Sequence, residues 1–246
     1  MAHIIDGKEI SRQIKAELKE TLDKWAAQQI TATLAVVQVG HDPASDVYVR
    51  NKKRTCTELG IRSLSYELPE SVSQKELLCL VEELNGREDV DGILVQLPLP
   101  SHIDEKAVLN AVSPEKDVDG FHPYNVGALS CGEDCFVPAT PAGILELLKR
   151  SGIELDGKEC VVVGRSNIVG KPVAQLLLAQ NATVTVTHSH TRNLAEVTRR
   201  ADVLVVAAGK RHLIGAEHVK PGAVVIDAGM HRDENNKLSG DVDLSL

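Results

Sequence analysis

The sequence predicts an α/β protein of two domains, each built around a parallel β-sheet. Three observations carry this prediction. Short apolar, β-branched runs alternate along the chain with longer segments of helical period, which is the pattern of βαβ units. The length of 246 residues suits one large or two modest domains. Hydrophobic residues make up 43% of the chain and aromatic residues only 2%, so the core should be aliphatic and β-branched.

The first domain, expected over residues 1–138, should open with a helix and continue as a βαβαβ unit. Ile4–Gln29 is expected to be mostly helical, because an apolar stripe recurs along it at i, i+4 spacing. The stripe consists of Ile10, Ile14, Leu18 and Leu22. The later elements are expected to be a strand at Leu34–Val39, a helix at Ala44–Leu59, a strand at Arg62–Leu68, a helix at Ser73–Asn85 and a strand at Gly92–Leu97.

The second domain, expected over residues 139–246, is organised around Glu159–Pro172, which reads ECVVVGRSNIVGKP. Cys160–Val163 predicts a buried strand, Gly164 ends it, and Val169–Ala179 predicts a packed helix. In a Rossmann unit, a strand, a glycine turn and a helix present free backbone N–H groups to a pyrophosphate. The spacing departs from G-x-G-x-x-G, so an ordinary βα turn is an equal alternative on this stretch alone.

The residues after the next strand favour NADP as the cofactor. Ala182–Thr187 predicts that strand, and an NAD site usually has Asp or Glu near its end to hold the ribose 2′-hydroxyl. Here the chain reads His188-Ser189-His190-Thr191-Arg192, so no carboxylate stands there to repel a 2′-phosphate. Arg165, Ser189 and Arg192 could bind such a phosphate through charge-assisted bonds or a hydroxyl donor.

The remaining segments of the second domain should complete its parallel sheet. A helix at Ala142–Arg150 is expected to open the domain, just after Pro138–Pro141. Two further strands are expected at Val203–Ala207 and Ala223–Asp227, at βαβ spacing. They are followed by Gly209 and Gly229, and glycine at the carboxyl end of a parallel strand permits close approach by a ligand.

Composition argues against several other classes of function. The net charge of −8 disfavours a general nucleic-acid binder, which needs a basic face. The first ten residues form no apolar leader, and no run approaches 18 apolar residues, so we expect a soluble cytoplasmic protein that does not bind membranes. Of the five cysteines, Cys131 and Cys135 lie close together but have no second ligand pair nearby, which argues against a zinc site. The Asp117–Gly120 turn matches only part of the EF-hand pattern, which argues against calcium. Free thiols and no metal are therefore expected.

The first half has no glycine fingerprint, so its chemistry should come from side chains. Tyr48 and Lys52 share a helix face at i, i+4, where a lysine of lowered pKa could transfer protons to a flat, nitrogen-rich substrate. The commoner alternative is a solvated charge run, since Lys53 and Arg54 follow. Gln96 ends a strand, where α/β sheets put ligand groups, although a buried structural amide competes with that interpretation.

Five segments in order resemble the bifunctional methylenetetrahydrofolate dehydrogenase/cyclohydrolase family, the FolD family. The likeness runs from Ile4 to Asp243, nearly the whole chain, and several long motifs in order are more specific than any one of them. The segments are Pro43-Ala-Ser-x-x-Tyr48-Val-x-x-Lys52, Gly92-Ile-Leu-Val-Gln96-Leu-Pro-Leu-Pro, Lys116-Asp-Val-Asp119-Gly-Phe-His-Pro, Pro138-x-Thr-Pro141 and Gly164-Arg-Ser-x-Ile-Val-Gly-x-Pro172.

The resemblance implies an NADP-dependent enzyme of one-carbon metabolism with two activities. It would oxidise 5,10-methylenetetrahydrofolate to the methenyl cation and hydrolyse that cation to 10-formyltetrahydrofolate, supplying purine, methionine and histidine synthesis. Folate would bind the N-terminal domain and NADP the C-terminal Rossmann domain, with a cleft between them, and the enzyme would be a cytoplasmic homodimer. No metal would be needed, because the cation is already electrophilic.

The resemblance also implies roles for individual residues. Tyr48 would stack on the folate ring system, Lys52 would move the protons of the hydrolysis, Gln96 would be hydrogen-bonded to Lys52 and tune it, and Asp119 would hold the polar edge of the pterin. The implied catalytic residues are therefore Tyr48, Lys52, Gln96 and Asp119, with Val95 and Leu97 as further substrate contacts. The implied cofactor contacts are Gly164, Arg165, Ser166, Ser189 and Met230.

Two departures from the family pattern bear on these expectations. Ala139 stands where the family usually has cysteine, a position we interpret as packing. The family also continues past Gly240-Asp241-Val242 with a Pro-Gly-Gly-Val-Gly-Pro segment and a last helix, whereas this sequence stops at Leu246. A chain that ended there should still bind NADP but turn over folate poorly and tend to associate.

Two other functions are weighed against this one. A shikimate-dehydrogenase-like oxidoreductase also pairs a lysine-bearing domain with an NADP domain, but Tyr48-x-x-x-Lys52 and the VQLPLP segment argue against it. A non-catalytic NADP-binding module is the second alternative, and it would bind NADP tightly without oxidising folate. The bifunctional enzyme is preferred because the proton-transfer residues are all present.

Overall fold

The chain folds into two compact units, Met1–Val126 and Gly127–Leu246. The computed structural model describes residues 3–40, 43–232 and 238–243, with only the backbone for 43–48. The division falls inside the helix α5 (Pro123–Cys131) and so precedes the boundary expected at 138/139. Among the described residues, no helix is long and apolar enough to cross a membrane.

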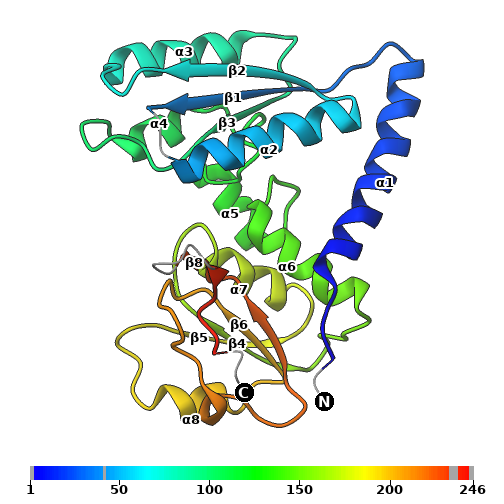
Figure 1. Ribbon diagram of the computed structural model, residues 1–246, viewed down its shortest axis with the longest axis vertical. Helices are drawn as coiled ribbons and strands as arrows, with labels where there is room; N and C mark the ends of the chain where they lie inside the picture. The colour runs from blue at the N-terminus through cyan, green and yellow to red at the C-terminus, as the bar shows by residue number, and fades with distance from the viewer. Residues whose placement is uncertain (1–2, 41–42, 233–237, 244–246) are drawn as a thin grey trace. The chain divides into compact units, whose positions relative to one another are not determined.

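Unit 1 is a three-stranded parallel sheet with helices on both faces (Figure 1). The strands lie in the order β2-β1-β3, with β1 paired in parallel to both neighbours. The elements are α1 (Gly7–Ala27), β1 (Thr33–Val39), α2 (Pro43–Leu59), β2 (Arg62–Leu68), α3 (Gln74–Gly86), β3 (Gly92–Val95) and α4 (Glu105–Ala111). The predicted βαβαβ order is therefore present.

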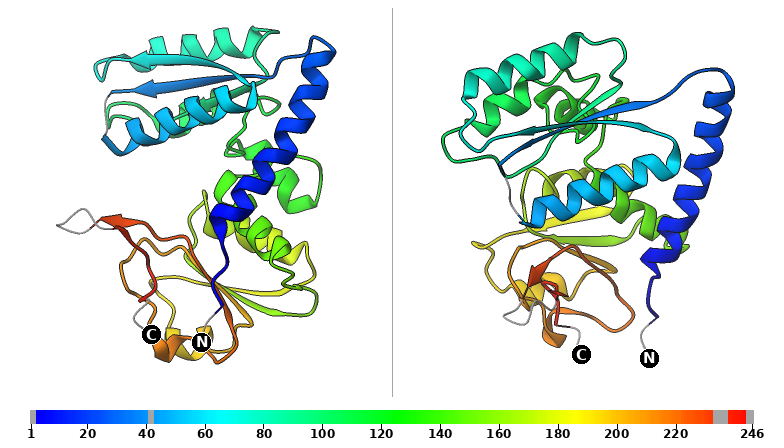
Figure 2. Two further views of the ribbon diagram at one scale, coloured as in Figure 1. Left: turned by 45° about the vertical axis from the view of Figure 1, so that its right-hand side comes forward. Right: turned by 45° about the horizontal axis from the view of Figure 1, so that its top comes forward.

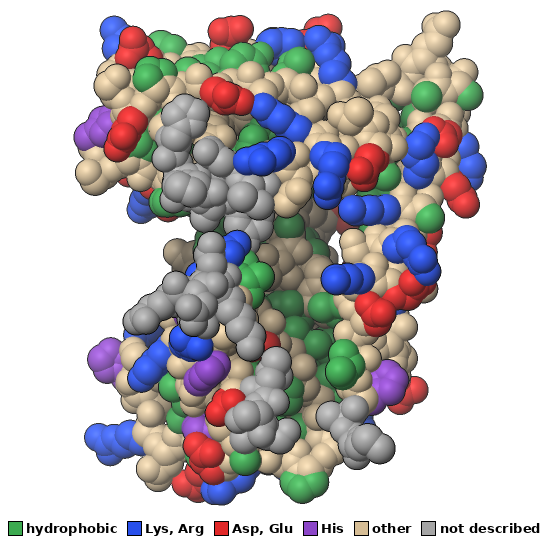
Figure 3. All heavy atoms as spheres, viewed as in Figure 1, with side chains coloured by type: hydrophobic (Ala, Val, Ile, Leu, Met, Phe, Trp, Pro, Cys, Tyr) green, Lys and Arg blue, Asp and Glu red, His purple; other side chains and the backbone are tan. Residues whose placement is uncertain are grey.

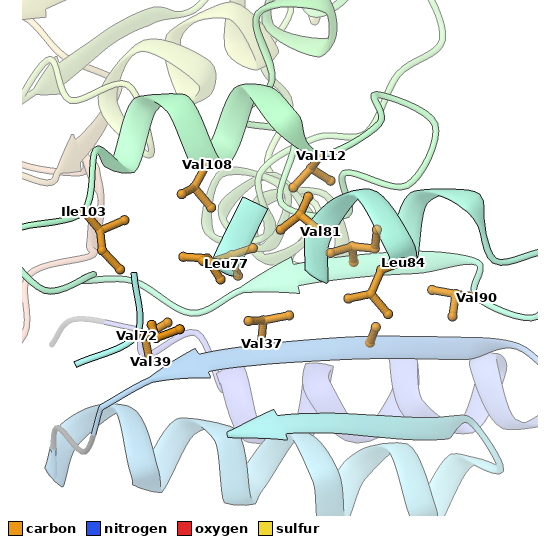
Figure 4. Packing of buried hydrophobic residues seen from close by; sticks show 13 residues of the cluster. Val37, Val39, Val72, Leu77, Val81, Leu84, Val90, Ile103, Val108 and Val112 are labelled. Carbon is orange, nitrogen blue, oxygen red and sulfur yellow. The ribbon is translucent and has the colours of Figure 1, made fainter. Parts of the chain in front are cut away.

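Alternating residues of β1 pack against helices on opposite faces of this sheet. Val37 and Val39 pack against α3, through Leu77 and its neighbours, and against α4 (Figure 4). Val36 instead packs against Val49 of α2 and Leu94 of β3. Because both faces are covered, the strand is almost continuously apolar, and the helices are held at fixed positions over the sheet.

The apolar stripe that predicts helix α1 is mostly not buried in the structure. The helix lies mostly away from the sheet, to which the segment 28–32 joins it (Figure 2). Ile10 is its only residue buried among those described, and Leu18 is 46% exposed. Basic and acidic side chains are interspersed along the face of α1 seen in Figure 3, and two ion pairs join them, Arg12 with Glu9 and Lys19 with Asp23.

Unit 2 contains a four-stranded parallel sheet in the order β5-β4-β6-β7. Strand β4 lies between β5 and β6, so successive connections run to opposite sides of it, which makes a topological switch point. The elements are α6 (Ala139–Arg150), β4 (Glu159–Val163), α7 (Gly170–Leu178), β5 (Thr183–Thr187), α8 (Leu194–Thr198), β6 (Val203–Val206), the 3₁₀ turn η1 (Ala216–His218), β7 (Val224–Asp227), β8 (His231–Arg232) and β9 (Leu238–Ser239).

Candidate active site

Lys52 lies on α2 and is directed to the end of β3. Its Nζ donates a hydrogen bond of 3.1 Å to Oε1 of Gln96, 44 residues further along the chain. Val49, one turn earlier, is buried against the sheet, which fixes the orientation of the helix. Lys52 is therefore half-buried at the sheet and is not part of a fully solvated charge run, as the alternative reading of the sequence would have it. The side chain of Tyr48, predicted to share this face, lies outside the described residues.

Gln96 is held so that one oxygen faces the lysine. It follows β3 directly, and its backbone N–H donates to the carbonyl of Val37 at 2.8 Å. Its side-chain Nε2 donates to the carbonyl of Leu97 at 2.8 Å, which leaves Oε1 for Lys52. Leu97 is partly exposed beside it, whereas the Val95 side chain is buried in the core. Of these two predicted substrate contacts, Val95 can offer a ligand only its backbone.

Asp119 projects from a turn whose other side chains are used to hold the turn itself. Nζ of Lys116 donates to the carbonyl of Arg87 at 2.6 Å, at the end of α3. The buried Asp117 carboxylate accepts from the backbone N–H of His122 at 2.8 Å and from Nδ2 of Asn125 at 3.0 Å. Among the described residues, no hydrogen bond uses the Asp119 carboxylate, which is half-buried near Lys52.

Burial pushes both members of the Lys52–Asp119 pair toward their neutral forms. It lowers the pKa of Lys52, while the charge of Asp119 and the Cys56 thiol oppose that shift. It raises the pKa of Asp119 to about 6, which the nearby Lys52 opposes and Asp117 reinforces. Paired titratable groups displaced in this way are typical of proton-transfer sites. The cluster can therefore accept and return a proton near neutral pH.

The turn after β4 in unit 2 has the geometry of a phosphate cradle. Gly164 has φ +121°, and a Cβ there would collide with the backbone of Ala207. Ser166 Oγ accepts from the N–H groups of Val169 and Gly170 at 3.2 and 3.3 Å, at the start of α7. Within the described chain, the N–H groups of residues 165–168 donate no hydrogen bond. Four free amides before a helix N-terminus form a site for an anionic ligand.

The predicted contacts to a 2′-phosphate lie at the ends of neighbouring strands. Ser189 follows β5 and is exposed, in a turn closed by the Thr191 hydroxyl, which accepts from the His188 N–H at 2.9 Å. Arg165 follows β4, which pairs in parallel with β5, and is exposed. Met230, the last predicted cofactor contact, follows β7 and is 58% exposed. These residues therefore stand along the carboxyl edge of one sheet.

A set of acidic residues that the sequence does not mark as functional organises these loops. Asp117 holds the turn of Asp119, and the pair Asp227 and Asp241 bonds the loops after β6 and β7. The expectation for Gly229 also needs correction, because its missing side chain makes room for Asp241 and not for a ligand. Each acid lies near a glycine turn, but nothing in the sequence alone marks Asp117 and Asp241 as buried or Asp227 as half-buried. No group that could hold a metal ion occurs among the described residues.

The fold and these two sites define a class: a two-unit α/β enzyme with a proton-transfer cluster and a dinucleotide-binding unit. The chain belongs to the tetrahydrofolate dehydrogenase/cyclohydrolase family. The model of that family's catalytic domain matches residues 5–119, and the model of its NAD(P)-binding domain matches residues 138–246. This assignment favours the first functional hypothesis over the shikimate-dehydrogenase-like one.

Curated relatives and solved structures agree with the family assignment. The chain is 64% identical over 243 residues to the bifunctional protein FolD of Lachnoclostridium phytofermentans, covering 99% of this chain and 86% of the relative. It superposes on the FolD structure from Campylobacter jejuni with a TM-score of 0.97 and 48% identity, covering 99% of this chain and 86% of that structure. The Trypanosoma brucei enzyme, solved with NADP and an inhibitor, superposes with a TM-score of 0.93 and is 39% identical. That superposition covers 99% of this chain and 86% of the other.

Proposed function

We propose that the chain oxidises 5,10-methylenetetrahydrofolate with NADP and hydrolyses the resulting 5,10-methenyl cation to 10-formyltetrahydrofolate. The observation that carries the proposal is the Lys52–Gln96–Asp119 cluster, which supplies a proton-transfer group where unit 1 offers strand ends to a ligand. The relatives named above are bifunctional FolD proteins, and this chain spans 86% of their length. The two activities would thus use one folate site.

The NADP-binding unit supports the oxidation by orienting the cofactor. When bound, NADP accepts the hydride that leaves the methylene bridge of the substrate. The free amides of residues 165–168 would hold its pyrophosphate, while Arg165 and Ser189 would hold the 2′-phosphate. Met230, exposed after β7, would contact the other half of the dinucleotide. No side chain has to move a proton in this step, so orientation is the main requirement.

Lys52 would carry the proton transfers of the hydrolysis. Its lowered pKa makes the neutral amine accessible, so Nζ can take a proton from the water that attacks the bridge carbon of the methenyl cation. The same proton returns to a ring nitrogen as its bond to that carbon breaks, and the hydroxyl loses its proton as the formyl group forms. One proton is released overall. The hydrogen bond that Nζ donates to Gln96 would keep the amine directed at the reacting carbon.

Asp119 and Tyr48 would bind the flat ring system of folate. A carboxyl group with a pKa of about 6 can both donate and accept hydrogen bonds near neutral pH, which suits the donor–acceptor edge of a pterin. Tyr48 precedes Lys52 by one helical turn and would stack on the ring, with Val95 and Leu97 bordering it through backbone and side chain respectively.

A matched pair of lysine substitutions tests the function. Lys52→Met should lower methenyltetrahydrofolate hydrolysis by about 10²–10⁴-fold, the usual contribution of general acid–base catalysis, and lower the NADP-dependent oxidation much less. Lys53→Met is the control, because Lys53 pairs with Glu67 on the exposed side of the same helix. Both rates are followed by absorbance with purified protein, methylenetetrahydrofolate and NADP.

The two variants can also contradict the proposal. Hydrolysis by Lys52→Met at the rate of Lys53→Met would remove Lys52 from the proton-transfer role. Tight NADP binding by the unsubstituted chain without folate oxidation would instead favour a non-catalytic binding module.

We further propose a cytoplasmic homodimer whose functional domains divide at 138/139. The family models support the boundary, since they end at residue 119 and begin at residue 138. All five cysteines are free thiols, as in proteins of reducing compartments. Among the described residues, strand β5 is an edge of its sheet, and Val186 on it is 40% exposed, which makes a surface suited to self-association. Light scattering after size exclusion would rule out the dimer if it gave the monomer mass of 26.6 kDa.

A further inference from the structure

A buried carboxylate connects three loops at the carboxyl edge of the second sheet. Asp241 is 0% exposed, and both of its oxygens are used. Oδ2 accepts from the backbone N–H groups of Ala208 and Gly209, at 2.7 and 2.9 Å, just past the end of β6. Oδ1 lies 2.7 Å from Nε2 of His231, which follows β7. A residue more than 30 positions later in the chain thus fixes the loop that leaves β6.

A second carboxylate holds the segment that carries Asp241. Asp227 is the last residue of β7, and its Oδ1 accepts from the N–H groups of Gly229 and Asp241, at 2.8 and 3.1 Å. Its Oδ2 accepts from the N–H of Val242 at 3.0 Å. The two acids therefore form one chain of bonds, from β7 through Asp241 to the loop after β6.

Two glycines leave room for this network. A Cβ on Gly229 would overlap the Asp241 carboxylate, and a Cβ on Gly240 would overlap Asp227. A buried charge costs several kcal/mol unless its bonds are fully satisfied, so the fully buried Asp241 carboxylate, whose segment the half-buried Asp227 holds, indicates a role beyond packing.

The location indicates that purpose. Strands β6 and β7 continue the sheet on the far side of β4 from β5, and their carboxyl ends form the side of the switch point opposite the glycine turn. A dinucleotide that places its pyrophosphate at the turn after β4 extends its other half across this side. The loop bonded to Asp241 would therefore border the half of a bound NADP that carries the nicotinamide.

We propose that Asp241 is a positioning residue for hydride transfer, which fixes the Ala208–Gly209 loop against the nicotinamide half of NADP. This inference rests on the proposed function. Because Asp241 accepts hydrogen bonds from both loop amides, it holds the loop in one conformation, and Asp227 and His231 hold Asp241 in place. The Lys52–Gln96–Asp119 cluster belongs to unit 1, whereas this network belongs to unit 2.

Three variants test the role. Asp241→Ala leaves the N–H groups of Ala208 and Gly209 without this acceptor, so dehydrogenase kcat should fall about a hundredfold, the cost of a misplacement near 1 Å. Cyclohydrolase activity on supplied methenyltetrahydrofolate should stay at the unsubstituted rate, because that step transfers no hydride. Asp241→Asn should restore most of the lost kcat, since its one carbonyl oxygen can accept from both amides while Nδ2 donates to His231 in its other tautomer.

Asp202→Ala is the matched control for a merely structural loss. Asp202 also accepts from a backbone N–H of this sheet, that of Glu159 at 2.9 Å, and also pairs with a cation, Lys220. It does so at the opposite, amino edge of the same strands. Its loss should lower the melting temperature without changing the ratio of the two activities.

The outcomes separate the inference from the proposed function. Equal loss of both activities in Asp241→Ala, or an activity ratio equal to that of Asp202→Ala, would overturn the positioning role. An unsubstituted chain without turnover would instead refute the proposed function, and the fluorescence of bound NADPH then decides the inference alone. Nicotinamide emission reduced in Asp241→Ala, but kept in Asp241→Asn and Asp202→Ala, supports the role, and equal emission in all three overturns it.

Discussion

At the scale of single residues, the candidate active site depends on charges that the fold makes unfavourable. Lys52 and Asp119 attract each other, yet burial outweighs that attraction in both, so the pKa of the lysine falls and that of the acid rises. Burial thus displaces the pKa of each group toward that of the other, which is typical of a proton-transfer site.

The shifted acid makes a prediction about stability and pH. The pKa of Asp119 is about 6 in the folded chain, above the ordinary value of 3.8, so its ionised form is disfavoured by folding. The protonated carboxyl of Asp119 therefore makes its full contribution to the free energy of unfolding below about pH 4, and this contribution is lost as pH rises through about 6. Asp119→Asn should raise the free energy of unfolding by about 1–2 kcal/mol at pH 8, after allowance for partial exposure, and by nothing at pH 3.5.

Urea denaturation at the two pH values measures this effect. Glu115→Gln, at an exposed position near the same turn, is the control and should change stability equally at both. A gain for Asp119→Asn that is as large at pH 3.5 as at pH 8 would contradict the assigned shift.

Cofactor choice is also decided by single residues. Arg165→Ala should lower kcat/KM for NADP about tenfold to a hundredfold, the worth of one charge-assisted bond, and leave the value for NAD nearly unchanged. Arg199→Ala, exposed just after α8, is the control. Steady-state rates with each dinucleotide measure the change. Equal losses with NAD and NADP would show that Arg165 does not contact the 2′-phosphate.

At the scale of elements, the turn from β4 to α7 is fixed by sterics. Gly164 and Gly170 are packed against backbone, the first on Ala207 and the second on the carbonyl of Gly164 itself. The close approach brings the helix N-terminus over the strand ends, so that the free amides converge. The sequence could show the glycines and the strand, but not the unused N–H groups, which follow from the turn geometry.

Two alanine substitutions separate this crowding from ordinary glycine flexibility. Gly164→Ala needs φ near +121° and collides with Ala207, so it should lower the free energy of unfolding by about 3 kcal/mol or more and abolish NADP binding. Gly152→Ala, at φ +69° with open space around it, should cost about 1–2 kcal/mol and leave binding intact. Calorimetry and NADPH titration measure both, and equal costs would refute the steric argument.

The strands of the two parallel sheets and the longer helices are predictable from this sequence, whereas several short helices are not. The strand Arg62–Leu68 is predicted to the residue, and most other predicted elements are within three residues of their observed ends. Helices α4, α5 and α8 were missed, because five to nine residues carry too little periodicity and such helices depend on caps and packing, such as Asp104 at the start of α4. The Lys52–Gln96 bond joins residues far apart in sequence and follows from the sheet order rather than from spacing.

At the scale of the whole molecule, the chain is two compact units with separate ligand chemistry. The single tryptophan, Trp25, is 43% exposed on α1 and belongs to unit 1. The candidate NADP site belongs wholly to unit 2. The two units can therefore be followed by different signals in one sample.

NADP should stabilise one unit and not the other. At a hundred times its Kd, a ligand adds about 2.7 kcal/mol to the unit that binds it, or about 1–2 M in the urea midpoint. The far-UV circular dichroism transition of unit 2 should move by this amount, while the Trp25 fluorescence transition stays in place. NAD at the same concentration is the control and should shift the first transition less. A Trp25 transition that moves equally would mean that the units unfold together.

In the turn around Asp119, the residues that hold the backbone are different from the residue proposed to bind the ligand. The shape of the turn is held by its other side chains. Lys116 donates a hydrogen bond at the end of α3, Asp117 accepts one from Asn125, and Val118 packs against Gly92. The Asp119 carboxylate makes no hydrogen bond among the described residues, so it does not help to hold the turn. The shape of the turn and the proposed recognition of folate thus depend on separate positions, so position 119 can change without loss of the turn. A library randomised there should yield folded proteins almost throughout, whereas one randomised at Asp117 should not.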